Sequence, residues 1–407
     1  MIKNKTLLFI HQNFPAQFQH ICRQLAPKNR IFFITKKNAN RMPGVRLVEY
    51  ELKTNPDHKP HSYLNSMQNA VYHAQAATRA MLSLRQQGVR PDIIVGHCGW
   101  GETLFVKDIY PNVPLLSYFE FYYAATGADA NFDKEFPVEP DLPLRTRMRN
   151  MIFLSSLEST DVGLSPTKWQ HSRLPAIFQP KVEIIHEGVD TTALIPSPAP
   201  SVKINEKLSF DGSVPLVTYV ARNLEPHRGF HVFMRAVKPI LDQNPEAQIV
   251  IVGGEEVSYS RRLPNGETYK QRALKENPVD TSRVHFVGKL PYDIFKKLLQ
   301  TSDAHVYLTY PFVLSWSFLE AMSTECLVIG SKTPPVEEVV RHGENGILVD
   351  FFDPKGIAAA VTDALRNKER YREMRRAARQ TVVENYDLTT VTLPKHLALL
   401  ERMIDRR

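Results

Sequence analysis

Long apolar runs and paired cysteines are missing from this chain of 407 residues. Its three cysteines, Cys22, Cys98 and Cys326, lie far apart and never in a CxxC spacing. This pattern argues against a disulfide framework or a cysteine-built zinc site, and it favours a reducing compartment. No stretch approaches the roughly 20 apolar residues that cross a bilayer, and the apolar run 7–10 is too short for a signal peptide core. We therefore expect a cytoplasmic protein.

Several short catalytic signatures are also absent. The chain has no GxxxxGKS/T phosphate loop, no GxGxxG fingerprint and no GxSxG elbow, which weighs against P-loop hydrolysis, common dinucleotide binding and serine hydrolase chemistry. It has neither a DxD pair nor an HExxH motif, so ligands for Mg²⁺ or zinc are not evident. We expect neither a metal nor a cofactor.

Positive charge is in excess, with a formal net charge of +8. Such an excess suits an anionic small ligand, an anionic membrane surface or nucleic acid equally well. The basic run 366–380 alternates with glutamates and has apolar residues at helical spacing, so we expect a solvated helix face and no nucleic-acid partner. The run 144–158 leaves two interpretations open. It is either a peripheral contact with the inner face of a membrane or an ordinary amphipathic helix packed on a sheet.

Short apolar runs alternate with amphipathic stretches along the whole chain, which predicts parallel strands with right-handed crossovers. The predicted strands are 6–10, 31–35, 92–96, 114–119, 162–166, 182–186, 215–221, 247–254, 284–288, 304–309, 326–331 and 346–350. A proline-rich stretch, 195–202, interrupts the pattern and reads as a linker. We therefore expect an α/β fold with two doubly wound Rossmann-like domains that face each other across a cleft. Ligands in such sheets lie at the carboxyl ends of the strands.

Two arginines follow the first strand of the second half. Arg222 comes directly after the predicted strand, and Arg228 precedes Gly229 and the next helix. Guanidinium groups at a strand end and near a helix N-terminus suit a diphosphate, because each offers a fork of donors and the helix end adds backbone N–H groups. Two surface arginines in a loop are the alternative.

Blocks of sequence in the second half resemble the retaining glycosyltransferases of family 4, which have the GT-B fold. They are "VTYVARNLEPHRGF", "IVIVGG", "VHFVGKLP", "SFLEAMSTECLVIGS" and "EEVVRHGENGILVDFFDP". The first half is similar to a subgroup of that family through "HQNFPAQFQHICRQLA" and "YFEFYYAATGADANFD". The resemblance implies an acceptor domain over residues 1–200, completed by a C-terminal helix over 388–407. It also implies a nucleotide-sugar domain over residues 201–387.

Matching positions in these blocks imply site residues. Arg222 and Arg228 match the basic pair on the donor diphosphate, and His97 matches a histidine that faces the transferred sugar. These three are the expected catalytic residues. The expected donor-binding residues are Gly253, Gly254, Gly288, Lys289, Phe312, Leu314, Ser315, Trp316 and Glu320. The expected acceptor-binding residues are Asn13, Phe14, Gln17, Glu120 and Tyr122.

Simpler interpretations stand beside these roles. His97 could be a structural histidine after a buried strand, and Glu320 could be a first-turn acid that complements a helix dipole. Phe312 and Trp316 could be core aromatics. The expected chemistry needs no side-chain base, because the departing phosphate oxygen can take the acceptor's proton. Its largest need is stabilisation of charge on the leaving diphosphate, which arginines and backbone amides supply without a metal.

The chain departs from the family pattern at two positions near the predicted donor. Phe312 stands where the E-x7-E motif has its first acid, which contacts hydroxyls of the donor sugar, and Ser315 replaces a glycine. One hypothesis is that Glu120 or the backbone of 312–316 binds these hydroxyls instead.

The expected function is therefore hexosyl transfer with retention, from a nucleotide-sugar to a glycan, a lipid-linked molecule or a small molecule. The alternatives are a GT-B-fold sugar-nucleotide epimerase and a non-catalytic sugar-nucleotide binding protein.

Overall fold

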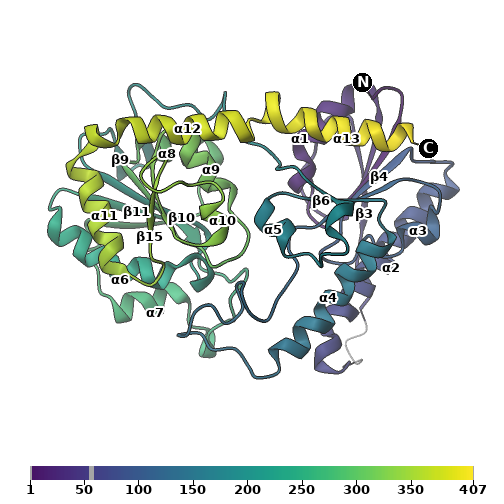
Figure 1. The fold of residues 1–407 in the computed structure, drawn as a ribbon, viewed down its shortest axis with the longest axis horizontal. Helices are drawn as coiled ribbons and strands as arrows, with labels where there is room; N and C mark the ends of the chain where they lie inside the picture. Colours follow the sequence, from purple (N-terminus) through teal and green to yellow (C-terminus); the bar gives the residue numbers. More distant parts are fainter. Residues whose placement is uncertain (1, 55–58, 407) are drawn as a thin grey trace. The chain divides into compact units, whose positions relative to one another are not determined.

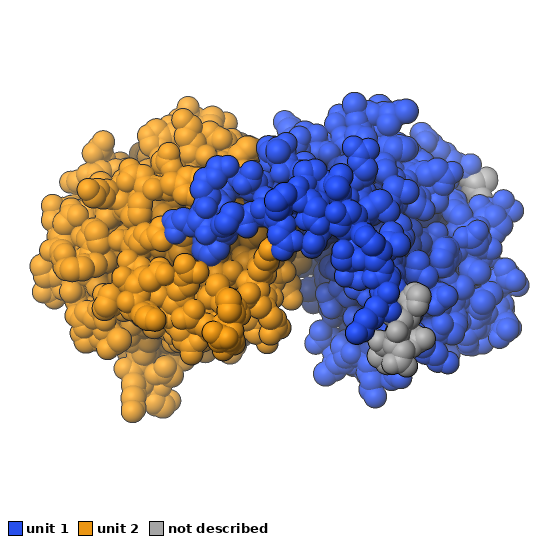
Figure 2. Space-filling model, turned by 90° about the horizontal axis from the view of Figure 1, so that it is seen from below, with its two compact units in different colours: residues 1–188, 388–407 blue, residues 189–387 orange. Residues whose placement is uncertain are grey.

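A computed structural model describes residues 2–54 and 59–406. The chain divides into two compact units, shown in different colours in Figure 2. Unit 1 comprises residues 1–188 and 388–407, and unit 2 comprises residues 189–387. Each unit is built on one sheet whose strands are all parallel. The prediction of two doubly wound Rossmann-like domains is confirmed in this respect.

The sheet of unit 1 has seven strands in the order β3-β2-β1-β4-β5-β6-β7. Their bounds are β1 Thr6–Ile10, β2 Arg30–Lys36, β3 Val45–Tyr50, β4 Ile93–His97, β5 Leu115–Tyr118, β6 Val162–Ser165 and β7 Val182–Ile184. The helices are α1 Gln19–Leu25, α2 Asn65–Gln86, α3 Val106–Ile109, α4 Leu142–Ser159, α5 Lys168–Ser172 and α13 Leu393–Asp405. Figure 1 labels β3, β4, β6 and the six helices.

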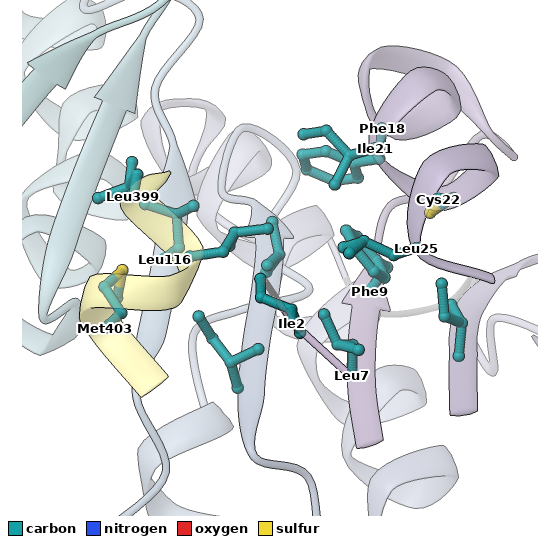
Figure 3. Packing of buried hydrophobic residues seen from close by; sticks show 14 of the residues in the cluster. Ile2, Leu7, Phe9, Phe18, Ile21, Cys22, Leu25, Leu116, Leu399 and Met403 are labelled. Carbon is teal, nitrogen blue, oxygen red and sulfur yellow. The ribbon is translucent and has the colours of Figure 1, made fainter. Parts of the chain in front are cut away.

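Both faces of this sheet are buried, because successive residues of a strand point to opposite sides. From β1, Leu7 and Phe9 join a core cluster with α1 and α13, whereas Leu8 and Ile10 join a second cluster with α2. Figure 3 shows the first cluster, with Leu399 and Met403 of α13 beside Leu116 of β5. The C-terminal helix thus completes the core of unit 1.

The sheet of unit 2 has six strands in the order β12-β11-β10-β13-β14-β15. Their bounds are β10 Leu216–Asn223, β11 Gln248–Gly254, β12 Val284–Gly288, β13 Ala304–Tyr307, β14 Leu327–Ser331 and β15 Ile347–Val349. A separate hairpin pairs β8 Val202–Asn205 with β9 Leu208–Phe210. The helices are α6 Phe230–Gln243, α7 Tyr269–Glu276, α8 Tyr292–Thr301, α9 Trp316–Ser323, α10 Pro334–Glu337, α11 Pro354–Arg366 and α12 Arg372–Tyr386.

The first boundary between the units lies earlier than the one predicted after residue 200. Val189 and Leu194 are buried in a core cluster of unit 2, and Val189 forms a parallel bridge with Asp387. Residues 189–194 therefore belong with the second unit, and the proline-rich stretch is not the boundary. Among the residues that the structure describes, no helix combines the length and apolar character needed to span a membrane.

Candidate functional site

The two predicted diphosphate arginines have different environments. Strand β10 continues to Asn223, so Arg222 lies within the strand and not in the loop predicted to follow it; its side chain is exposed. Arg228 is 5% exposed. Its Nη1 donates hydrogen bonds to Tyr307 Oη at 3.1 Å, to Thr309 Oγ1 at 2.8 Å and to the Val313 carbonyl at 2.9 Å. Arg228 therefore fixes the segment after β13, whereas Arg222 faces solvent.

Arg228 remains cationic in this buried position. Burial by itself lowers the pKa of its guanidinium, but the neighbouring Tyr307, Tyr259 and Glu225 outweigh that effect and raise the pKa above its ordinary value. A cation that makes internal hydrogen bonds in this way is a fixed source of positive charge at the carboxyl end of the sheet. It can stabilise an anion there without reorganising.

Glu225, which was not predicted, links two loops near Arg228. It is fully buried, and its carboxylate accepts hydrogen bonds from three successive backbone N–H groups. The distances are 3.2 Å to Ser258, 3.0 Å to Tyr259 and 2.8 Å to Ser260. The loop before α6 thereby holds the loop after β11. Lone acids in loops are common, and the partners are 33–35 residues away, so spacing alone could not reveal this link.

The glycines at the end of β11 permit close packing. A Cβ at Gly253 would lie 2.9 Å from the Ala221 carbonyl oxygen, and one at Gly254 would lie 2.5 Å from Asn223 Oδ1. Gly253 therefore needs glycine for the contact with the backbone of β10, whereas the close atoms at Gly254 belong to side chains. Gly288 ends β12 with a φ of +66°, a left-handed conformation that favours glycine. Lys289 follows it and lies 3.9 Å from the carboxylate of Glu256.

Glu320 lies in the second turn of α9, since the helix begins at Trp316 and its first turn holds no acid. The first-turn interpretation is therefore wrong. The side chain is half-buried, and Oε1 accepts a hydrogen bond of 2.8 Å from the hydroxyl of Tyr292. Burial raises the pKa of this carboxyl, and the hydrogen bond from Tyr292 opposes that rise. Tyr292, the first residue of α8, was not predicted.

The segment that leads into α9 corrects three expectations. Phe312 is 4% exposed, so its ring packs inside unit 2 and does not line an open surface. The N–H of Ser315 donates to Tyr307 Oη at 2.8 Å and is therefore already used within the protein. Trp316 is 47% exposed and is not a core aromatic. Leu314 is half-buried against a core cluster.

In unit 1, His97 ends β4 and is 1% exposed. Its ring stacks with Trp100, at a centroid distance of 4.3 Å, and with Tyr118, at 5.3 Å. The N–H of Gly99 donates to Nδ1 at 3.1 Å, which places the proton of the neutral ring on Nε2. Among the described residues, no hydrogen-bond partner meets this buried Nε2. Glu120 Oε2 is 3.7 Å away, beyond hydrogen-bonding distance. Buried donors are usually satisfied by protein or by water, so this N–H is available to a water molecule or a ligand.

His11 lies beside His97 and was also missed. The residue directly follows β1, its ring lies 4.9 Å from that of His97, and its Nδ1 accepts the N–H of Asn13 at 2.8 Å. Burial, and secondly His97, lowers the pKa of His11 well below its ordinary value, against the opposing effect of Gln17. His11 is therefore neutral. His11 could have been predicted as a site residue, because it lies at the carboxyl end of a predicted strand.

The predicted acceptor residues are only partly gathered around this pair. Gln17 lies near His11, and Glu120 lies near His97, while Asn13 is exposed. Phe14 is 3% exposed and packs edge-on against Phe33 at 4.8 Å. It is a core residue, so its prediction as an acceptor contact is wrong. Tyr122 packs against the core cluster around Phe153.

Comparisons with known proteins agree with this architecture. Residues 27–194 match the family model "Glycosyl transferase family 4 group", and residues 202–381 match "Glycosyl transferases group 1". The chain is similar in structure to sucrose-phosphate synthase from Thermosynechococcus elongatus, with a TM-score of 0.72, 17% identity and coverage of 99% of this chain and 100% of that one. It is also similar to HepE of Anabaena, solved with UDP-glucose, with a TM-score of 0.69, 12% identity and coverage of 98% and 100%.

Two curated relatives are similar in sequence. The GDP-mannose-dependent α-(1-6)-phosphatidylinositol monomannoside mannosyltransferase of Mycobacterium tuberculosis is 27% identical over 246 residues, which are 58% of this chain and 60% of that relative. The N-acetyl-α-D-glucosaminyl L-malate synthase of Bacillus anthracis is 33% identical over 104 residues, 26% of this chain and 27% of that relative. The chain thus spans less than two thirds of the length of each. With both family models matched in order, this chain belongs to the family 4 glycosyltransferases and has their GT-B fold of two Rossmann-like domains.

Proposed function

We propose that this chain is a hexosyltransferase that moves a sugar from a nucleotide-sugar to a hydroxyl acceptor with retention of anomeric configuration and without a metal. The observation that carries the proposal is the order of the two family matches, 27–194 and 202–381, along nearly the whole chain. His97, Arg228 and Glu320 then occupy the carboxyl-end regions of the two sheets, where ligands of such folds bind.

In unit 2, we assign the nucleoside diphosphate to the surface around Arg222 and Glu320. Glu320, already oriented by Tyr292, is suited to accept hydrogen bonds from ribose hydroxyls. Arg222 is exposed and can reach a phosphate, whereas the charge of Arg228 acts from within the protein. Together they stabilise the charge that develops on the leaving group.

The proposed reaction needs no further reagent. The bond between the anomeric carbon and the diphosphate oxygen breaks, and the acceptor oxygen bonds to that carbon on the same face. The acceptor's proton passes to the departing phosphate oxygen. In unit 1, the Nε2–H of His97 can donate to a sugar hydroxyl. No observation favours the epimerase or the non-catalytic alternative.

The acceptor is proposed only as a class, a hydroxyl on a glycan, a lipid-linked molecule or a small molecule, in the cytoplasm. The three free cysteines are buried, which is compatible with a reducing compartment. A peripheral contact with the inner face of a membrane would go through α4. Leu144 and Met151 are exposed, but Arg145 is already paired with Glu139 and Asp141.

A panel of UDP- and GDP-hexoses tests the proposal. We expect at least one of them to raise the melting temperature by mass action, and we expect nucleoside diphosphate release to increase when hydroxyl acceptors are added. Release should persist in excess EDTA. Loss of release in EDTA would overturn metal independence, and binding without any release or transfer would favour the non-catalytic alternative.

A further inference from the structure

Phe312 stands where the family has an acid that contacts the donor sugar, so another residue has to border that sugar. The ring at this position is buried, and it packs against Tyr259 at a centroid distance of 4.9 Å and an interplanar angle of 65°. It also meets the edge of His227 at 6.0 Å. The residue that stands in place of the acid is therefore covered, and the ring that covers it comes from another part of the chain.

Tyr259 is 38% exposed and lies in the loop between β11 and α7. Its ring centroid is 5.5 Å from the guanidinium carbon of Arg228 and 6.0 Å from the ring of His227. Tyr259 thus borders both the buried arginine and Phe312. A sugar attached to a diphosphate near these residues would meet the face or edge of this ring.

The position of Tyr259 is tightly determined. The fully buried carboxylate of Glu225 holds the backbone N–H groups of residues 258–260. Asn223 Nδ2 donates to Ser258 Oγ at 2.8 Å, and Ser260 Oγ lies 3.0 Å from His227 Nδ1. Every one of these anchors belongs to the segment 223–227, which runs from the end of β10 to the turn that carries Arg228. A half-exposed aromatic ring fixed in this manner is a preorganised contact surface and not a mobile loop tip.

We propose that Tyr259 is a specificity-determining residue that forms an aromatic wall against the donor sugar. This inference rests on the proposed function. An aromatic wall contacts the C–H face of a pyranose and makes no demand on an individual hydroxyl, unlike a carboxylate. The expected donors are therefore nucleotide-hexoses with one broad C–H face, and epimers or deoxy analogues at the hydroxyls that an acid would bind should also be used.

The two kinds of contact differ in how strongly they discriminate between donors. A site that hydrogen-bonds a substrate hydroxyl rejects an analogue without it by about 10⁴–10⁵-fold, whereas an apolar surface discriminates by about 10²-fold at most. We therefore expect kcat/KM to differ by less than about 100-fold between the preferred donor and its deoxy or epimeric analogues at the hydroxyls that an acid would bind.

Two variants at one position form the test. Tyr259→Ala removes the wall, so KM for the nucleotide-sugar should rise about tenfold, while affinity for the nucleoside diphosphate alone changes by less than about threefold. Tyr259→Phe keeps the ring and should stay within about threefold of the wild type for both ligands. Phe352→Ala is the matched control, since Phe352 is an aromatic residue of the same unit with 46% exposure and no role in the proposed site.

The outcomes distinguish failure of the inference about Tyr259 from failure of the proposed function. An unchanged KM for the nucleotide-sugar in Tyr259→Ala would overturn the inference, as would equal losses for the sugar nucleotide and the bare diphosphate, because these indicate a general effect on the loop. A wild-type enzyme that rejects donors altered at those hydroxyls by more than about 100-fold would also overturn it. If the wild type binds and turns over no nucleotide-sugar at all, the proposed function itself fails.

Discussion

At the scale of single residues, the arginine pair shows how neighbours in sequence acquire different tasks. Arg222 is exposed, whereas Arg228 is enclosed and makes three hydrogen bonds from one nitrogen. Loss of a buried charged donor leaves its acceptors unsatisfied, which is costly, while loss of an exposed arginine removes only its contact with a ligand.

This contrast predicts opposite outcomes for two alanine substitutions. Arg222→Ala should lower kcat/KM by about tenfold or more while changing the free energy of unfolding by less than about 0.5 kcal/mol. Arg228→Ala should lower the free energy of unfolding by roughly 2–5 kcal/mol and reduce activity as well. Urea unfolding and steady-state kinetics on both variants check this. Equal destabilisation by the two substitutions would contradict it.

The unpartnered Nε2–H of His97 supports a second residue-scale prediction. His97→Ala should lower kcat/KM by about 100-fold, because a preorganised donor to the sugar is lost. His97→Asn, which retains an N–H donor, should recover part of that loss. His61→Ala, at an exposed histidine of the same unit, serves as the control. If His97→Ala proves less stable but keeps its kcat/KM, His97 is structural.

At the scale of elements, β13 carries a buried histidine that ties stability to pH. His305 is fully buried, and its Nδ1 lies 2.9 Å from Thr218 Oγ1 on β10. Burial lowers its pKa from the ordinary 6.5 to about 4. The unfolded chain binds this proton more readily than the folded one does, so stability falls as the pH decreases.

The expected result is a pH-dependent loss of stability that depends on His305. The stabilisation is fully present above a pH of about 6.5, and roughly 3 kcal/mol is lost by pH 4. Urea unfolding of the wild type and of His305→Gln at pH 7 and pH 5 measures it. The variant should show a shallower decrease between the two pH values. If the free energy of unfolding decreases equally in the wild type and the variant, the pH dependence does not come from His305.

Gly253 gives a further element-scale prediction. A Cβ there would meet a backbone oxygen of β10 at 2.9 Å and Leu224 Cδ2 at 2.7 Å, and backbone cannot move aside cheaply. Gly253→Ala should therefore lower the free energy of unfolding by about 1–3 kcal/mol and weaken donor binding. Gly266→Ala tests strain without crowding, because Gly266 has a φ of +73° but no heavy atom within 4 Å of the built Cβ.

Elements with a strong periodic signal were predictable, and those defined by distant partners were not. The buried strands of both sheets follow from short apolar runs, whereas β3 is mostly half-buried or exposed and was missed. His97 and Glu320 could be found from their blocks of sequence. The roles of Glu225 and Tyr259 could not, because they depend on hydrogen bonds and ring contacts between loops. Phe14 was misplaced because a residue beside a site in sequence can still point into the core.

At the scale of the whole molecule, the chain forms two parallel-sheet units. It passes from the first unit to the second once and returns once. Residues 189–387 form the second unit, and the chain then returns to complete the first with α13. This organisation places the residues assigned to the donor in one unit and His97 in the other. Substitutions at Arg222 or Glu320 should therefore affect nucleoside diphosphate binding, and substitution of His97 should leave it within about threefold.

The stereochemistry of the product tests the central claim most directly. Wild-type enzyme is incubated with a nucleotide-sugar from the panel and a hydroxyl acceptor, in excess EDTA, and the anomeric configuration of the new glycoside is determined by NMR. The proposed mechanism predicts one glycoside formed per nucleoside diphosphate released, with the configuration of the donor retained. An inverted product, or diphosphate release without a glycoside in the presence of acceptor, would contradict it.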